Sequence, residues 1–385
     1  MLKKRGIPLV LTAILILTSC ARDISEDDKN SNTDETTAQA TITTLSAEEL
    51  DMQKAHGILD SMTTEEKIGQ LFFVRCPTES PEKQLEFIEK YHLGGYILFA
   101  ADFKENSPEG VKADITSYQN ASEIPMLIGI DEEGGDIVRM SKYPQYRGER
   151  FKSQSEMLEN GTLHEDIIEK AEYLTSYGIN INLAPVADVS TDEEDYIYNR
   201  TFHVDGKETA DAIKTVVEAN NEVNYPSVLK HFPGYADNAD THQGIAYDKR
   251  DFETIENSDL LPFISGIQSG ADAVMVSHNI IESIDGKMPA SLSRNVNFIL
   301  RNNLNFDGVI MTDDLSMKAI TTFTNDESPA VSAFKAGNDI ILQSDFEEGY
   351  MAMLNAYNSG EITEERLNES VLRILLLKVK RNIIR

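Results

Sequence analysis

Cysteine is almost absent from the sequence: two of the 385 residues are cysteines, Cys20 and Cys76. Cys20 lies in an N-terminal segment outside the expected fold, so a single thiol is left for the folded part. One thiol cannot form an internal disulfide framework, and stability must therefore come from a hydrophobic core. Hydrophobic residues make up 41% of the chain, which is enough for a sizeable core. We expect Cys76, which lies beside an apolar run, to be an inert packing residue.

Positive charge is also scarce. The chain has 35 Lys and Arg residues against 65 Asp and Glu residues, which gives a formal net charge of −30. Nucleic-acid binding needs a basic patch, and loose adsorption to an anionic membrane depends on basic residues too. The composition therefore argues against both kinds of partner and predicts a soluble, self-repelling surface.

The N-terminal apolar stretch is short. It runs from Ile7 to Leu17 and follows three basic residues, Lys3, Lys4 and Arg5. A basic start and a short apolar core predict a secretory signal peptide over residues 1–19. A membrane-spanning anchor, the least favoured alternative, usually needs a longer apolar stretch.

The signal ends in Leu17-Thr18-Ser19-Cys20, which resembles the box at which bacterial lipoproteins are cleaved and lipidated. The resemblance implies a lipid on Cys20 and a membrane-anchored, extracytoplasmic protein; an ordinary signal peptide is the alternative. Residues 20–45 then form the expected tether, because 21–45 contain no aromatic residue and few apolar ones, which is typical of disorder.

Order is expected to begin at Ser46. The stretch Ser46-Ala-Glu-Glu49 has the pattern of a capping box that opens a helix, and Thr63-Thr-Glu-Glu66 repeats it. We assign residues 46–385 to one catalytic domain, because no change in composition marks a second one.

Eight short apolar runs recur through this domain. They lie at residues 71–75, 94–99, 125–131, 178–185, 226–232, 272–278, 307–313 and 338–343. Charged segments with helical periodicity, such as 163–178 and 363–385, separate or follow them. Continuous apolar strands indicate a parallel sheet that is buried on both faces. Eight such units predict an α/β fold of the (β/α)8 TIM-like barrel type, with an open doubly wound sheet as the alternative.

Ionisable side chains stand at the C-terminal ends of these runs. They are Arg75, Asp131, Asp188, Lys230, His231, His278, Asp313 and Asp314. In a (β/α)8 barrel those strand ends meet at the face that carries active sites, so these side chains together predict a pocket. Taken singly, Asp188 and His278 are better explained as caps of the helices that follow.

The stretch KHFPGYADNADTHQG, residues 230–244, places Asp240 and His242 two positions apart. In an extended segment both side chains would lie on one side. An Asp beside a His fixes its tautomer and favours its protonated form, which leaves the other nitrogen as a positioned proton donor or acceptor. A loop-stabilising contact explains the spacing equally well.

Four of the residues in this region could also be zinc ligands: His231, Asp240, His242 and His278. The ammonium of Lys230 beside His231 and the lack of a compact ligand motif disfavour that interpretation. We therefore expect no metal and no cofactor.

Six segments resemble, in order, the β-N-acetylglucosaminidases of glycoside hydrolase family 3 in their single-barrel form. They are IDEEGGDIVRM (130–140), INLAPVADV (181–189), NRTF (199–202), KHFPGYADNADTHQG (230–244), PASLS (289–293) and GVIMTDDLSM (308–317). The resemblance spans roughly residues 46–385. It implies a barrel with retaining cleavage of β-linked N-acetylglucosamine.

The resemblance also implies residue roles. By position in the motifs, Asp313 is the nucleophile, His242 is the acid/base and Asp240 is its partner. The residues implied to hold the terminal sugar are Asp131, Arg139, Arg200, Lys230 and His231. Retaining cleavage needs a carboxylate on one face of the sugar and a proton donor on the other, which agrees with this set.

Five positions depart from the family pattern. Tyr235 and Ala236 stand where the family commonly has His-Gly, Thr241 replaces Ser, Asp136 replaces Arg and Glu132 replaces Gln. None of these changes removes a catalytic residue. They bear on the loop geometry and on the preferred leaving group.

The expected function is an exo-acting, lipid-anchored glycosidase that trims N-acetylglucosamine from peptidoglycan fragments. A carbohydrate is then the partner, and the membrane is contacted only through the anchor. A phosphorylase is one alternative, because a histidine acid/base does not repel phosphate as a carboxylate would. A non-catalytic, sugar-binding surface lipoprotein is another.

Overall fold

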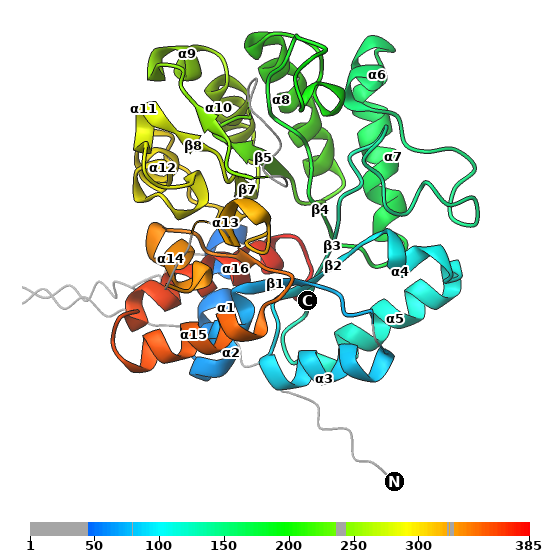
Figure 1. Cartoon of the computed structure of the whole chain (residues 1–385). Coiled ribbons are helices and arrows are strands. Elements are labelled where there is room, and N and C mark those ends of the chain that lie inside the picture. The colour runs from blue at the N-terminus through cyan, green and yellow to red at the C-terminus, as the bar shows by residue number, and fades with distance from the viewer. Residues whose placement is uncertain (1–44, 79, 236–243, 322, 324–326) are drawn as a thin grey trace, which may run out of the picture. The chain divides into compact units, whose positions relative to one another are not determined.

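Eight parallel strands stand at the centre of the molecule (Figure 1). The computed structural model describes residues 45–385, except residues 79, 236–243, 322 and 324–326. The central strands are β1 (Phe72–Arg75), β2 (Gly95–Leu98), β3 (Leu127–Ile130), β4 (Ile181–Asn182), β5 (Val228–Phe232), β7 (Ala273–Val276), β9 (Val309–Thr312) and β10 (Ile341–Leu342). Each of the eight apolar runs contains one of them, so the strand prediction is confirmed.

The strands close into a barrel. One sheet has the order β10-β1-β2-β3-β4 and another has the order β5-β7-β9, with every pair parallel. Parallel bridges join the two sheets at both edges, between Val186 and Lys230 and between Met311 and Ile340. The predicted (β/α)8 barrel is therefore confirmed over the open-sheet alternative.

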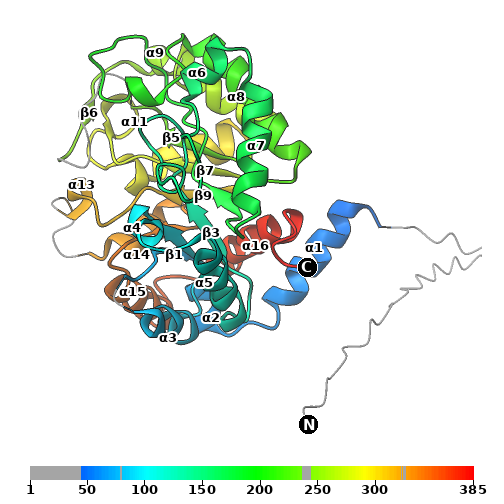
Figure 2. The ribbon, with the colours of Figure 1, turned by 90° about the vertical axis from the view of Figure 1, so that its right-hand side faces the viewer.

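Helices follow the strands and surround the barrel (Figures 1 and 2). They are α3 (Pro81–Tyr91), α4 (Ala100–Lys104), α5 (Pro108–Ala121), α6 (Gln154–Glu159), α7 (Leu163–Thr175), α8 (Gly206–Glu222), α9 (Phe252–Asn257), α10 (Leu260–Gln268), α11 (Glu282–Asp285), α12 (Arg294–Phe298), α13 (Lys318–Thr321), α14 (Pro329–Ala336), α15 (Glu347–Asn358) and α16 (Glu364–Lys380). Two short strands outside the barrel, β6 (Tyr247–Asp248) and β8 (Ile280–Ile281), pair with each other. The apolar runs had not predicted this pair.

Two helices precede the first strand, and both begin as predicted. The first, α1 (Ala47–Leu59), has Ser46 as its N-cap, and α2 (Thr64–Gln70) has Thr63. In each, the cap hydroxyl accepts a hydrogen bond from the backbone N–H three residues on, at 3.2 Å. The Glu carboxylate returns one to the cap N–H, at 2.7 Å for Glu49 and 2.6 Å for Glu66. These reciprocal bonds satisfy N–H groups that a helix start leaves unpaired.

The core contains the strand side chains and the inner faces of the helices. Cys76 is buried there, and burial raises the pKa of its thiol far above the ordinary range. It is therefore an inert packing residue, as predicted. Over the described residues, no helix has the length and apolarity needed to cross a membrane.

A buried lysine lies at the N-terminal end of the barrel, away from the strand ends that carry the candidate site. Lys378 on α16 donates hydrogen bonds to Oε1 of Gln70 at 2.7 Å and to the carbonyl of Gly94 at 3.0 Å. Its side chain is fully buried, and burial lowers the pKa of Lys378 to about 7.

Candidate active site

A cavity of about 500 Å³ opens at the C-terminal ends of the barrel strands. Six of the eight residues predicted for catalysis and sugar binding line it: Asp131, Arg139, Arg200, Lys230, His231 and Asp313. They come from the ends of four strands, β3, β4, β5 and β9, or from the segments that follow them, so the barrel is what brings them together.

Lys230 is the buried cation of the site. It lies on β5 and is 2% exposed. Its Nζ lies 2.8 Å from Oδ1 of Asp131 and 2.6 Å from Oε1 of Glu133. Burial by itself would lower the pKa of Lys230, but the charges of Asp131 and Glu133 outweigh burial and raise it. Lys230 is therefore a fixed positive charge between two carboxylates.

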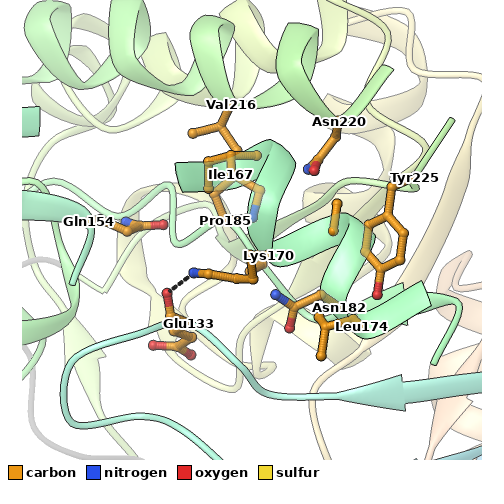
Figure 3. A pocket seen from close by; sticks show the side chains of 12 residues that line it. Glu133, Gln154, Ile167, Lys170, Leu174, Asn182, Pro185, Val216, Asn220 and Tyr225 are labelled. Carbon is orange, nitrogen blue, oxygen red and sulfur yellow. Dashed lines mark hydrogen bonds between the residues drawn. The ribbon is translucent and has the colours of Figure 1, made fainter. Parts of the chain in front are cut away.

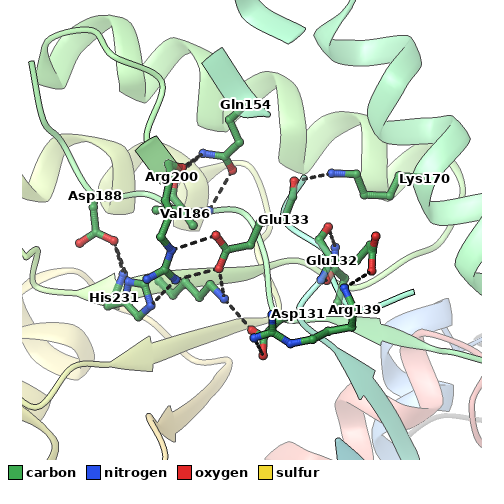
Figure 4. A network of polar contacts seen from close by, with 12 residues as sticks. Asp131, Glu132, Glu133, Arg139, Gln154, Lys170, Val186, Asp188, Arg200 and His231 are labelled. Carbon is green, nitrogen blue, oxygen red and sulfur yellow. Dashed lines mark hydrogen bonds and ion pairs between the residues drawn. The ribbon is translucent and has the colours of Figure 1, made fainter. Parts of the chain in front are cut away.

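Glu133 is the central residue that sequence reasoning missed. Its carboxylate accepts two hydrogen bonds from Arg200, from Nη2 at 2.7 Å and from Nε at 3.0 Å, in addition to its contact with Lys230 (Figure 4). Burial would raise the pKa of Glu133, yet Arg200 and Lys230 hold it well below its usual range. A signal was present in the sequence, because Glu133 follows Asp131 by two positions as the chain leaves a strand.

Glu132, between these two carboxylates, has a structural role. Its Oε2 accepts hydrogen bonds from the backbone N–H groups of Arg139 and Met140, both at 2.9 Å. Its Oε1 accepts one from the N–H of Ser141 at 3.1 Å. The carboxylate therefore fixes the turn that returns Arg139 to the cavity, where Nη2 lies 3.5 Å from Oδ2 of Asp131.

Lys170 supports the same turn from behind. It projects from α7, is fully buried, and donates a hydrogen bond of 2.6 Å to the carbonyl of Glu133 (Figure 3). Burial lowers the pKa of Lys170 to about 8, against the opposing charges of Glu132 and Glu133. The backbone of Glu133 is thus held by a side chain that does not reach the main cavity.

His231 stands beside Lys230 and contacts Asp188. Its Nδ1 lies 2.7 Å from Oδ2 of Asp188, and its Nε2 lies 3.1 Å from Nη2 of Arg200. The capping interpretation of Asp188 was wrong, because its carboxylate accepts bonds from His231 and from the N–H of Tyr235 rather than from a helix start. His278 bridges Oγ of Ser291 and the carbonyl of Asp314 from a fully buried position.

Asp313 and Asp314 follow β9 and differ in their surroundings. Oδ1 of Asp313 accepts a hydrogen bond of 2.8 Å from the backbone N–H of Asp314. Asp314 is held by its neighbours: its carboxylate accepts from the N–H of Ser316 at 2.9 Å and from Oγ of Ser344 at 2.6 Å. Asp314 therefore ties β9 to the segment after β10.

The glycosyl hydrolase family 3 N-terminal domain matches residues 63–377. The chain belongs to glycoside hydrolase family 3. A family relative, the beta-hexosaminidase of Idiomarina loihiensis, is 33% identical over 315 residues, which are 80% of this chain and 93% of that protein. The beta-hexosaminidase of Methylobacillus flagellatus is 31% identical over 288 residues, 71% of this chain and 80% of that one.

A solved family 3 structure has the same architecture. The β-N-acetylglucosaminidase from Paenibacillus sp. str. FPU-7 superimposes with a TM-score of 0.77 at 29% identity, over 84% of this chain. The present chain covers 64% of that longer protein. The family 3 assignment thus rests on both the sequence and the fold.

Three predicted residues of this family 3 chain lie outside the part that the structure describes. They are Asp240 and His242, assigned to proton transfer, and Cys20, assigned to lipidation. Two of the four residues weighed as zinc ligands are therefore not described. Among the residues that are, no three His, Cys, Asp or Glu side chains are placed to hold a metal ion.

Proposed function

We propose that the chain is a retaining, exo-acting β-N-acetylglucosaminidase that removes terminal N-acetylglucosamine from peptidoglycan fragments. One observation carries the proposal: a row of alternating charges, two of them buried and three partly buried, lies in the same cavity as Asp313. The names of the family 3 relatives, beta-hexosaminidase and β-N-acetylglucosaminidase, support this choice of sugar.

The cavity is suited to holding a sugar by its hydroxyl groups. Asp131 and Glu133 offer acceptors, and Arg139, Arg200 and Lys230 offer donors, in positions that their mutual contacts fix. Arg139 is accessible to a ligand, because its side chain lines the cavity and is 24% exposed. Charged groups make strong, directional bonds to hydroxyls, so this set can orient one terminal sugar.

In the proposed reaction, a carboxylate oxygen of Asp313 attacks the anomeric carbon and the glycosidic C–O bond breaks. His242, oriented by Asp240, gives its proton to the departing oxygen. In the second step His242 takes a proton from water, the water oxygen bonds to the anomeric carbon, and the bond to Asp313 breaks. Two displacements retain the configuration of the sugar.

Turnover of a chromogenic N-acetylglucosaminide by the purified protein tests the activity, and product analysis with and without inorganic phosphate tests the class of reaction. We expect free N-acetylglucosamine in both conditions. A sugar phosphate formed only with phosphate would show a phosphorylase, and absence of turnover on any N-acetylglucosaminide would leave a binding protein.

Substrates with different leaving groups test the proposed role of the Asp240–His242 pair. Asp240→Asn should lower turnover of a natural disaccharide by roughly 10²–10⁴-fold, the usual range for general acid catalysis. A dinitrophenyl glycoside departs without protonation, so its first step should change little. Equal losses on both substrates would show that the pair only shapes its loop.

We further propose that Cys20 carries the lipid that anchors the protein outside the cytoplasmic membrane. The motif before Cys20 and the polar segment after it support this proposal. Mass spectrometry of the N-terminal peptide should show a modified Cys20, and Cys20→Ser should release the protein from membranes. An unmodified cysteine in a membrane-associated wild-type protein would contradict it.

A further inference from the structure

We propose that Asp188 is a positioning residue that fixes His231 with its ring proton on Nδ1, so that the Nε2 lone pair holds Arg200 for the sugar. This inference rests on the proposed function only in assuming that Arg200 binds the substrate. The tautomer itself can be tested without turnover.

Asp188 is 0% exposed, and its carboxylate is occupied on both oxygens. Oδ2 lies 3.0 Å from the backbone N of His231 and 2.7 Å from its Nδ1, and Oδ1 lies 2.8 Å from the backbone N of Tyr235. All three contacts thus use Asp188 as an acceptor. A carboxylate is the side chain of this size that can accept on both sides at once.

The ring proton follows from the partner of the other nitrogen. Nε2 of His231 lies 3.1 Å from Nη2 of Arg200 (Figure 4). A guanidinium has only N–H donors, so Nε2 must be the acceptor in this contact. The proton of the neutral ring is therefore on Nδ1, where it meets Asp188 at 2.7 Å.

Arg200 is consequently held from two directions. Glu133 accepts from its Nη2 and Nε, and His231 accepts from the same Nη2. If the ring proton were on Nε2, two N–H donors would face each other, and the guanidinium of Arg200 would be displaced. Through the ring of His231, Asp188 thus controls the position of Arg200 without touching it.

The variant Asp188→Asn tests this arrangement, because an amide of the same size has one oxygen and one NH2 group. It must turn the NH2 either toward His231, which reverses the tautomer, or toward the N–H of Tyr235. We expect kcat/KM to fall roughly 10–100-fold, mainly through KM, as for loss of a hydrogen bond to a charged group. Asp259→Asn is the matched control, since Asp259 is a similarly buried carboxylate that binds Arg250 and does not contact His231. It should stay within about threefold of wild type.

Substitutions of His231 distinguish the role of its imidazole ring from that of the other contacts of Asp188. The oxygen of His231→Gln can take the place of Nε2 and accept from Arg200, whereas His231→Asn is too short to do so. We expect the Gln variant to keep more of kcat/KM than the Asn variant. Asp188→Asn should lower kcat/KM by a smaller factor in the His231→Gln background than in the wild-type protein, because glutamine has no ring tautomer to reverse. Additive losses, or equal losses in the Asp188 and Asp259 variants, would overturn the proposal.

The tautomer is read directly from the ¹⁵N shifts of the His231 ring in the wild-type protein, assigned by comparison with His231→Gln. We expect the proton on Nδ1. A proton on Nε2 would overturn the proposal even if every Asp188 variant failed to fold. A wild-type protein that turns over no N-acetylglucosaminide but shows the Nδ1 proton would instead refute the proposed function alone.

Discussion

At the scale of single residues, Asp313 and Asp314 are adjacent carboxylates with different surroundings. Asp314 is engaged by Ser316 and Ser344, so its position serves the fold. We expect Asp313→Ala to lower kcat by 10⁴-fold or more, as is usual for loss of a nucleophile, while the melting temperature stays close to that of wild type. Turnover on a chromogenic glycoside measures this effect. Activity within tenfold of wild type would move the role to Asp314.

Glu133 illustrates the energetics of a buried carboxylate with two cationic partners. Removing its charge leaves Lys230 and Arg200 buried with less compensation, which usually costs roughly 3–5 kcal/mol. We therefore expect Glu133→Gln to lower the free energy of unfolding by about that amount in urea denaturation. Glu132→Gln is the matched control, because an amide oxygen can keep part of its backbone contacts. Equal stability of the two variants would contradict this account.

The pH dependence of this effect has a definite sign. The pKa of Glu133 is lower in the folded state than its ordinary value of 4.5. The stabilisation by its charge is thus complete above that ordinary value and is lost as the pH falls below it. Below about pH 4, the difference in stability between wild type and Glu133→Gln should shrink.

At the scale of elements, α2 begins with the Thr63–Glu66 capping box. Thr63→Ala removes the hydroxyl that accepts from the N–H of Glu66, and losing such a cap typically costs about 1 kcal/mol. We expect a corresponding fall in the melting temperature, measured calorimetrically. Thr64→Ala, which removes the same side chain one position later and none of these contacts, should have a smaller effect. A larger loss for Thr64→Ala would show that the cap contributes little.

Elements were predictable from the sequence because they depend on neighbouring residues. Eight apolar runs and two capping patterns correspond to eight strands and two helix starts. The spacing after β3 hints at Glu133, but the partners of Glu133 and Asp188 were not predictable. Lys230 and His231 come from another strand, and spacing along the chain does not show which strand ends meet. The β6–β8 pair was missed for a different reason: each strand has two residues, and neither lies within one of the eight apolar runs.

At the scale of the whole molecule, Lys378 couples protonation to folding. Its pKa is about 7 in the folded state against 10.5 ordinarily, because of burial. Between these values the unfolded chain binds more protons than the folded one, so the free energy of unfolding should rise with pH from about 7 to 10.5. The rise attributable to this residue is at most roughly 5 kcal/mol.

Denaturation of wild type and Lys378→Met across that range measures the contribution of Lys378. The methionine side chain has similar length and no charge, so the variant should show a flatter dependence on pH. A slope equal to that of wild type would mean that Lys378 does not change its protonation on folding.

The alternating charges around Lys230 have a consequence for the response to ionic strength. The surface of a chain with a net charge of −30 is strongly affected by dissolved salt, whereas buried and partly buried contacts in the barrel mouth are screened much less. The three cations Arg139, Lys230 and Arg200 each contact Asp131 or Glu133, so their charges are compensated within the protein rather than by dissolved ions. An uncharged sugar should therefore bind with nearly the same affinity at low and at high salt concentration.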